Sequence, residues 1–194
     1  MITAIIPAAG SSKRMGEPKA LMPWGKSTVL QTVISTLQAS GMRDVLVVTG
    51  ADRGRVESLI GKTVQTVFNE NYQSGEMLSS IQLGLTVKMR ESSAALICLG
   101  DQPQIEERSV RSVCEAFQKT KSNLVVPSYQ MRRGHPWLVA RPLWDEILNL
   151  RGTQTMRDFL NRHNGKIHYV ECDTPTILQD VDTPEDYLKF KPSL

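Results

Sequence analysis

The chain has 194 residues, of which 40% are hydrophobic and 22% charged, and this composition fits one globular domain with a substantial core. The formal net charge of +3 is small and the cations are dispersed among acids, which excludes a broad nucleic-acid-binding surface. The three cysteines, Cys98, Cys114 and Cys172, form no C-x-x-C pair, and no apolar run approaches the ~20 residues of a membrane span; we expect reduced thiols, no membrane partner and a cytoplasmic protein.

Short β-rich runs alternate with amphipathic stretches along the chain, a pattern typical of a largely parallel sheet flanked by helices. We expect strands at residues 2–7, 45–49, 64–68, 94–99, 124–126 and 167–170, an extended segment at 137–140, and helices at 27–40, 56–60, 77–87, 110–117, 143–150 and 155–161. The predicted fold class is α/β, a Rossmann-like three-layer α/β/α arrangement in a single domain over residues 1–194. Right-handed crossovers would place the loops after Ile6, Phe68 and Leu99 at one sheet edge, where open α/β folds bind ligands.

The first strand runs into a Gly/Ser turn that carries the cations Lys13, Arg14 and Lys19. Gly10 removes a side chain where the backbone must turn or approach a ligand, and the turn amides would face several phosphate charges together with the cations. Five residues separate Gly10 from Gly16, so the turn is not a Walker loop, and no G-x-G-x-x-G is present. The turn predicts an oligophosphate site, and the alternative is an ordinary solvated strand-to-helix loop.

A second strand exit opens the helix expected at residues 77–87. Here the backbone amides of Gly75 and the hydroxyls of Ser79 and Ser80 could contact a ribose, base or phosphate. The alternative is ordinary helix N-terminal chemistry.

The strand at residues 94–99 is followed directly by Gly100-Asp101-Gln102-Pro103. A carboxylate at the carboxyl end of a buried strand lies where a divalent ion could bridge it to phosphate oxygens. Gly, Asp and Pro also form turns without any ligand. Because a phosphate-type loop is expected at the same edge, we favour the metal site.

The C-terminal run Asp180-Val181-Asp182-Thr183-Pro184 combines a capping signal with two alternating carboxylates. Thr183 fits an N-cap with Pro184 at the first helical position, which accounts for everything after Asp182 without any function. Asp180 and Asp182 would point to one side of an extended segment, where they could supply further metal ligands.

The first turn resembles the signature Leu-Ala-Ala/Gly-Gly-x-Ser-x-Arg-Met-Gly-x-x-Lys of nucleotidyltransferases related to molybdenum-cofactor guanylyl- and cytidylyltransferases. The positions that match are Ala8, Ala9, Gly10, Ser12, Arg14, Met15, Gly16 and Lys19, while Pro7 replaces the usual Leu. The resemblance continues through Gly-Asp-x-Pro, Asp-x-Asp-Thr-Pro-Glu-Asp and a Gly-x-x-x-Ser-Ser segment, in family order.

The resemblance implies roles for individual residues. It makes Arg14, Lys19 and Asp101 catalytic, and Asp101 and Asp182 ligands of Mg²⁺ with Asp180 in support. The nucleotide site would comprise Ala8, Ala9, Gly10, Ser11, Ser12, Arg14, Lys19, Gly75, Ser79, Ser80 and Gly100. In the cytidylyltransferase branch an Arg-Gly-His-Pro element lies near the acceptor, so Arg133 and His135 are candidates to hold an anionic acceptor, although a lone His before Pro is often structural.

The implied activity is transfer of a nucleoside monophosphate from a nucleoside triphosphate to the phosphate of a molybdopterin-type cofactor, with release of pyrophosphate. Ala8-Ala9-Gly10 resembles the cytidylyltransferase side and favours CTP. The alternatives are a guanylyltransferase on the same cofactor, a sugar- or polyol-phosphate nucleotidyltransferase, and a non-catalytic nucleotide- or cofactor-binding module. A molybdoenzyme or its chaperone is the protein partner that the resemblance suggests.

Overall fold

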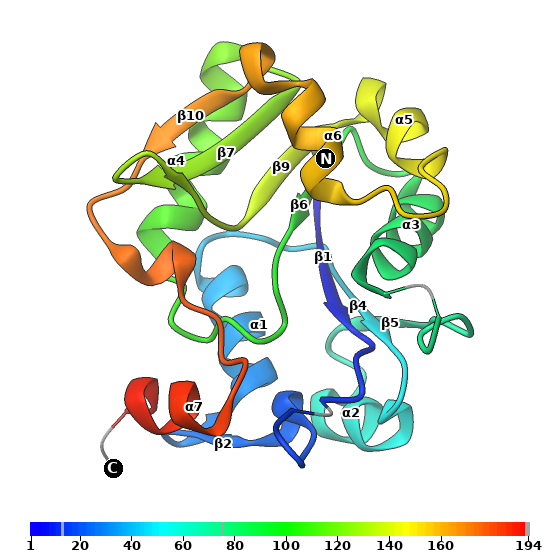
Figure 1. Cartoon of the computed structure of the whole chain (residues 1–194), viewed down its shortest axis with the longest axis vertical. Helices are drawn as coiled ribbons and strands as arrows, with labels where there is room; N and C mark the ends of the chain where they lie inside the picture. Colours follow the sequence, from blue (N-terminus) through cyan, green and yellow to red (C-terminus); the bar gives the residue numbers. More distant parts are fainter. Residues whose placement is uncertain (13, 75, 193–194) are drawn as a thin grey trace.

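The computed structural model describes residues 1–12, 14–74 and 76–192. Its main sheet has the strand order β10-β7-β9-β6-β1-β4-β5, with β8 paired to β7, and helices surround it (Figure 1). The strands are β1 (Ile2–Ala8), β4 (Val45–Thr49), β5 (Gln65–Phe68), β6 (Ala94–Ile97), β7 (Leu124–Tyr129), β8 (Arg132–Arg133), β9 (Trp137–Ala140) and β10 (His168–Glu171). A separate hairpin joins β2 (Pro23–Trp24) to β3 (Ser27–Thr28).

The central strand β1 determines where the loops emerge. It pairs in parallel with β4 on one side and β6 on the other, and β5 continues this parallel set. The carboxyl ends of these four strands therefore share one edge of the sheet, which in Figure 1 faces the end of the molecule that holds α2 and α7. The prediction that the loops after β1, β5 and β6 meet at one edge is confirmed.

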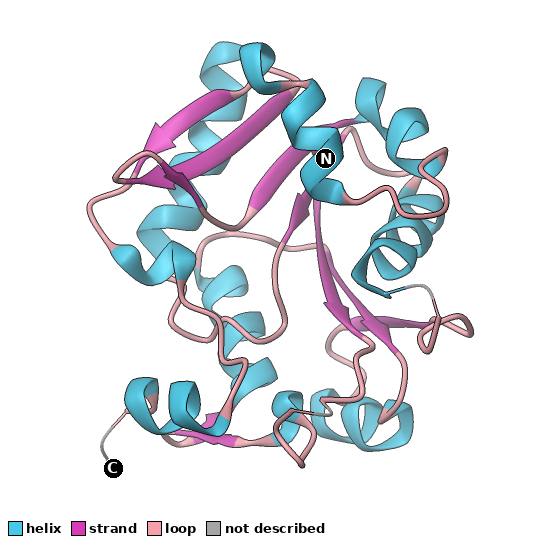
Figure 2. Cartoon of the chain, in the orientation of Figure 1, coloured by secondary structure: helices cyan, strands magenta, loops and turns pink. Residues whose placement is uncertain are grey.

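Helices pack on both faces of the sheet, as Figure 2 also indicates. They are α1 (Val29–Ala39), α2 (Arg53–Ile60), α3 (Glu76–Lys88), α4 (Glu107–Thr120), α5 (Trp144–Leu148), α6 (Met156–Arg162) and α7 (Pro184–Phe190), with 3-10 turns at η1 (Lys19–Leu21), η2 (Arg141–Leu143), η3 (Asn164–Lys166) and η4 (Pro175–Leu178). Ala4 and Ile6 of β1 join the core cluster with α1 and α4, whereas Ile5 joins the cluster with α3, α5 and α6. This alternation is that of a strand buried on both faces, and it confirms the three-layer α/β architecture.

Some boundaries differ from the prediction. The first helix begins at Val29 rather than residue 27, because Ser27 and Thr28 pair with the preceding strand and the Thr28 hydroxyl accepts a hydrogen bond from the Gln31 amide as the N-cap. Strand β9 occupies the expected residues but runs antiparallel between β6 and β7. Within the described ranges, no helix has the length and apolarity that crossing a membrane requires.

Candidate active site

Two glycines, Gly50 and Gly100, approach the backbone closely where β1 ends. A Cβ on Gly50, which follows β4, would lie 2.3 Å from the Ala9 carbonyl oxygen, and one on Gly100 would lie 3.0 Å from the Pro7 oxygen. Only glycine allows the backbones to approach so closely. Gly100 was predicted to belong to the site, but Gly50 was missed, although a glycine directly after a buried strand is a detectable signal.

Beyond Ala9 the loop opens toward solvent. Gly10 and Ser11 are exposed, and a Cβ on Gly10 would meet no atom of the described residues within 4 Å, so this part of the loop leaves room for a ligand. Ser12 has a positive φ of 48°, and its hydroxyl accepts a hydrogen bond from the Lys19 amide at 3.0 Å. Ser12 therefore closes the loop onto η1 and helps to position Lys19. Lys13 lies outside the described residues.

Lys19 lies between two carboxylates from distant parts of the chain. Its Nζ atom donates to Asp101 Oδ2 and to Asp182 Oδ1, each at 2.7 Å. Burial alone would lower the pKa of Lys19, but Asp101 and Asp182 outweigh it and raise the pKa above its ordinary value. Lys19 is thus a fixed cation at the carboxyl ends of β1 and β6.

Arg14 adds a second cation on the solvent side. Its guanidinium lies 3.1 Å from Asp182 Oδ2, and its side chain is 70% exposed. Burial would raise the pKa of Asp182, but hydrogen bonds and charges from Lys19 and Arg14 lower it below the ordinary value. The exposed remainder of Arg14 is free to meet a further anion.

Asp180 is a third carboxyl group near this site, where the charges of Asp101 and Asp182 act on it. Val181 is fully buried between Asp180 and Asp182, and its amide donates to the Asp101 carbonyl at 2.9 Å. Burial, together with the charges of Asp101 and Asp182, raises the pKa of Asp180 to about 7. Near neutral pH Asp180 is therefore partly protonated.

These carboxylates have the donor chemistry of a hard divalent cation such as Mg²⁺, which binds oxygen ligands. Lys19 takes the position between Asp101 and Asp182 in this structure. Among the described residues, no three acidic, histidine or cysteine side chains are grouped as a ready metal site. The residues present fit the ion by chemistry and charge, and Lys19 has to give up part of its contact with them.

At the neighbouring strand end, Asn69 organises the start of α3. Its side-chain amide donates to the hydroxyls of Ser79 at 2.8 Å and Ser80 at 3.0 Å. Ser80 is only 1% exposed, so its hydroxyl supports the start of the helix from inside in this structure, and its contact with a nucleotide stays a prediction. Ser79 is partly exposed at the same edge, and Gly75 lies outside the described residues.

The two candidate acceptor residues, Arg133 and His135, make different contacts in the structure. The Arg133 guanidinium donates to Tyr169, Asn161 and Asn164 at 2.7 to 2.9 Å. The His135 ring stacks on Trp137 with 4.1 Å between the ring centroids.

The ring of His135 is also electrically neutral at ordinary pH. Burial lowers its pKa to about 3, and its Nε2 atom is buried without a hydrogen-bond partner among the described residues. The neutral ring offers no positive charge to an anionic acceptor, and the acceptor role of Arg133 and His135 stays a prediction.

Comparison with known proteins identifies the family. A model of the MobA-like NTP transferase domain matches residues 4–167. The chain belongs to the family of MobA-like NTP transferase domains. The matched range covers the loop after β1 and Asp101, and ends before Asp180 and Asp182.

Curated relatives match almost end to end at low identity. Molybdenum cofactor cytidylyltransferase of Escherichia coli (strain K12) is 27% identical, with 98% of this chain and 95% of the relative covered. Nicotine blue oxidoreductase of Paenarthrobacter nicotinovorans is 26% identical (97% and 96%), and "Probable molybdenum cofactor guanylyltransferase" of Bacillus cytotoxicus is 29% identical (97% and 96%). The names of these relatives therefore differ in activity and in substrate.

Solved structures confirm the fold. Rv0371c from Mycobacterium tuberculosis H37Rv superposes with a TM-score of 0.88 at 24% identity, covering 99% of this chain and 97% of that one. A nucleotidyl transferase from Methanothermobacter superposes with a TM-score of 0.82 at 24% identity, covering 98% and 96%. Rv0371c in complex with manganese has a TM-score of 0.79 at 24% identity, covering 100% and 99%. Family and fold together confirm the predicted nucleotidyltransferase class.

Proposed function

We propose that this chain transfers a nucleoside monophosphate, with CTP as the preferred donor, to the phosphate of a molybdopterin-type cofactor in a Mg²⁺-dependent reaction. The observation that carries the proposal is the contact of Lys19 with Asp101 and Asp182 beside the open loop after β1. The names of the cytidylyl- and guanylyltransferase relatives support the acceptor class. We propose that the whole chain, residues 1–194, acts as one domain.

The reaction joins an oxygen of the acceptor phosphate to the α-phosphorus and breaks the bond from the α-phosphorus to the bridging oxygen of pyrophosphate, which leaves with that electron pair. An acceptor phosphate is already anionic, so no strong general base is required and catalysis consists of positioning and charge neutralisation. The site agrees with this demand, because its polar groups are cations, carboxylates and loop amides.

Arg14 and Lys19 would stabilise different parts of the departing pyrophosphate. The exposed amides of residues 10–12 and the Arg14 guanidinium would receive the pyrophosphate. Lys19 would exchange part of its carboxylate contact for the phosphate oxygens and stabilise the charge that grows on the bridging oxygen. Both roles use groups that the sheet edge holds together before substrate arrives.

The carboxylates would hold the metal. Asp101 and Asp182, with Asp180 beside them, would hold Mg²⁺, which would supply charge neutralisation for the phosphates. The manganese complex of Rv0371c supports divalent-ion binding in a protein of this fold.

The preference for CTP rests on the residues where β1 ends. Ala8-Ala9-Gly10 resembles the cytidylyltransferase branch, and Gly50 packs against Ala9. Calorimetric titration with CTP and GTP in the presence of Mg²⁺ tests this assignment. We expect CTP to bind about tenfold more tightly or better, whereas tighter binding of GTP would support the guanylyltransferase alternative.

A further inference from the structure

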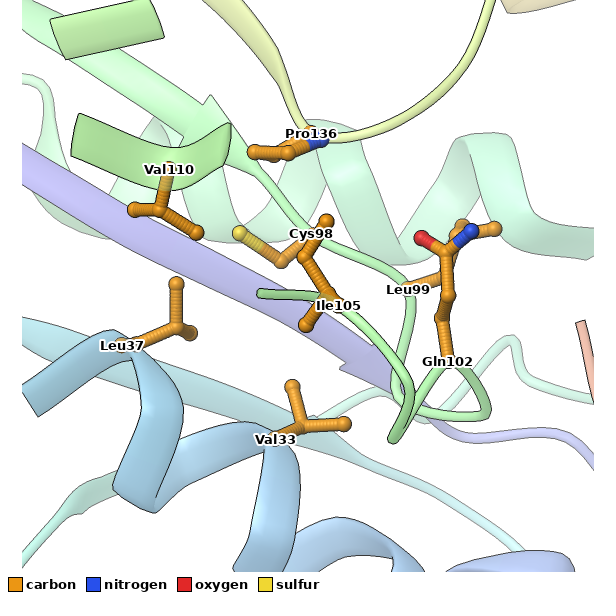
Figure 3. A pocket seen from close by; sticks show the side chains of 8 residues that line it. All are labelled: Val33, Leu37, Cys98, Leu99, Gln102, Ile105, Val110 and Pro136. Atoms are coloured by element: carbon orange, nitrogen blue, oxygen red, sulfur yellow. The ribbon is translucent and has the colours of Figure 1, made fainter. Parts of the chain in front are cut away.

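Gln102 is a buried polar residue next to the carboxylate Asp101. Its side chain is 1% exposed and, together with Cys98, Leu99 and Pro136, lines a cavity of about 10 Å³. Figure 3 shows the side chain extended beside Leu99, with its amide directed away from Val33 and Leu37 of α1. The cavity holds about one water molecule, so it is no ligand pocket, and a buried amide in this setting requires a partner.

That partner lies in the segment that leads to the other carboxylates. Gln102 Nε2 donates to the Thr176 carbonyl oxygen at 3.2 Å, and the same oxygen accepts the Gln179 amide at 3.3 Å. Gln102 therefore binds a carbonyl within η4, four residues before Asp180. We call residues 174–182 the C-terminal strap.

Two further contacts fasten the strap to the loop that carries Asp101. The Val181 amide donates to the Asp101 carbonyl at 2.9 Å, and the Thr174 hydroxyl donates to the Glu106 carboxylate at 2.7 Å. Residues 101–106 thus hold the strap at both ends and, through Gln102, in its middle. These contacts hold one side of the strap beside Asp101, while the His135 amide donates to the Ile177 carbonyl oxygen of the strap at 2.9 Å.

We propose that Gln102 is a positioning residue for the metal site, an inference that rests on the function proposed above. By holding the Thr176 carbonyl, it fixes the strap so that Asp180 and Asp182 face Asp101 and Lys19. Replacing Gln102 by Met keeps the side-chain length and removes no charge. A change in metal affinity would therefore report a change in geometry.

A matched control exists elsewhere in the fold. Gln82 of α3 also donates its side-chain amide to backbone carbonyls, those of Ile147 at 2.9 Å and Leu150 at 3.1 Å. These contacts join α3 to α5 and do not involve the strap. Gln82→Met removes the same kind of hydrogen bond without disturbing the proposed metal site.

The test measures Mn²⁺ binding by electron paramagnetic resonance in the presence of saturating CTP, or of GTP if titration selects it. Without acceptor there is no turnover, so the readout is independent of activity. We expect Gln102→Met to weaken Mn²⁺ binding about tenfold, the lower end of what loss of a ligand-supporting contact costs, and Gln82→Met to stay within about twofold of wild type. Equal affinity in Gln102→Met and wild type would overturn the proposal.

Two further measurements separate positioning from general loss of structure. Amide hydrogen exchange over residues 179–182 should become faster in Gln102→Met than in Gln82→Met. The Mg²⁺ concentration for half-maximal rate should rise, while the KM for nucleotide at saturating Mg²⁺ stays unchanged; a change in KM alone would count against the proposal. If Gln102→Met does not fold, Gln102→Asn, which keeps the amide but shortens its reach, should show the same order of effects.

Failure of the proposed function would be recognised separately. A wild-type chain that binds nucleotide but no Mn²⁺ would contradict the metal assignment before any substitution is made. The proposal for Gln102 would then lose its basis as well.

Discussion

Lys19 Nζ lies 2.7 Å from Asp101 Oδ2 although the two residues are 82 positions apart in the chain. The loops after β1 and β6 bring them together, since these strands are parallel neighbours in the sheet. Asp182, which lies 163 positions after Lys19 in the chain, also accepts a hydrogen bond from Lys19 Nζ. The pair thus connects the predicted phosphate loop to the predicted metal ligands.

The first prediction concerns the charges of this pair. Lys19→Ala should fold but lose about 2–4 kcal/mol of transition-state stabilisation, which corresponds to a rate about 30- to 1000-fold lower. Asp101→Ala should be impaired to a similar extent. Single-turnover rates and thermal unfolding measure the two effects separately.

Lys26 provides a control, because it is exposed in the turn between β2 and β3. Lys26→Ala should keep the rate within about twofold of wild type, as surface substitutions usually do. Near-normal turnover in Lys19→Ala or Asp101→Ala would show that the assigned role is wrong.

The second prediction concerns Gly50. In Gly50→Ala the new Cβ would lie 2.3 Å from the Ala9 carbonyl oxygen, so the backbone of the phosphate loop must move. We expect about 1–3 kcal/mol of lost stability and a nucleotide affinity at least about tenfold lower.

Gly54 of α2 has open space around its Cβ position, so Gly54→Ala should keep nucleotide affinity and gain up to about 1 kcal/mol of stability. Equal affinities in the two variants would contradict a tight Gly50–Ala9 contact.

The third prediction concerns the cap that follows Asp182. Thr183 and Asp186 form a capping box at the start of α7, and Thr155 and Asp158 form the same arrangement at α6. Thr183→Ala and Thr155→Ala should each cost about 1 kcal/mol of stability. Only Thr183→Ala should also raise the Mg²⁺ concentration needed for half-maximal rate, because Asp182 directly precedes the cap. If both variants raised this Mg²⁺ concentration equally, the result would contradict a specific link between the α7 cap and the metal site.

The fourth prediction concerns pH. Burial lowers the pKa of His135 from 6.5 to about 3, so below pH 6.5 the unfolded chain binds a proton that the folded chain does not. The free energy of unfolding therefore decreases as the pH is lowered below 6.5. Asp180 acts in the opposite sense, since its pKa is raised from 3.8 to about 7 and the folded chain takes up the extra proton below pH 7. In wild type the two effects oppose each other between pH 6.5 and 5.

His135→Phe removes one of these effects and keeps an aromatic ring that can stack on Trp137. From pH 6.5 to 5 the variant should gain stability relative to wild type, by up to about 1.4 kcal/mol per pH unit. Urea unfolding midpoints at a series of pH values measure this difference. A difference that does not change with pH would show that His135 is not held neutral.

The sequence predicts those features that depend on local pattern. The strand at 45–49, the cap at Thr183 and the loop after β1 follow from apolar runs, capping residues and glycines. Patterning does not reveal strand direction, so β9 was expected only as an extended segment and its antiparallel pairing was not foreseen.

Contacts between distant segments lie beyond such reasoning. Lys19, Asp101 and Asp182 were each named as site residues, but their direct contact depends on how three loops meet. Ser80 was predicted as a nucleotide-site residue. Its position in the sequence does not reveal that its side chain is buried and accepts a hydrogen bond from Asn69.

The most direct test of the proposed function is pyrophosphate release by the intact chain with Mg²⁺, purified molybdopterin-type cofactor and each of the four nucleoside triphosphates in turn. We predict release that is fastest with CTP, requires the cofactor and stops when EDTA removes the metal. Nucleotide binding without pyrophosphate release from any of the four would contradict the account and indicate a non-catalytic binding module.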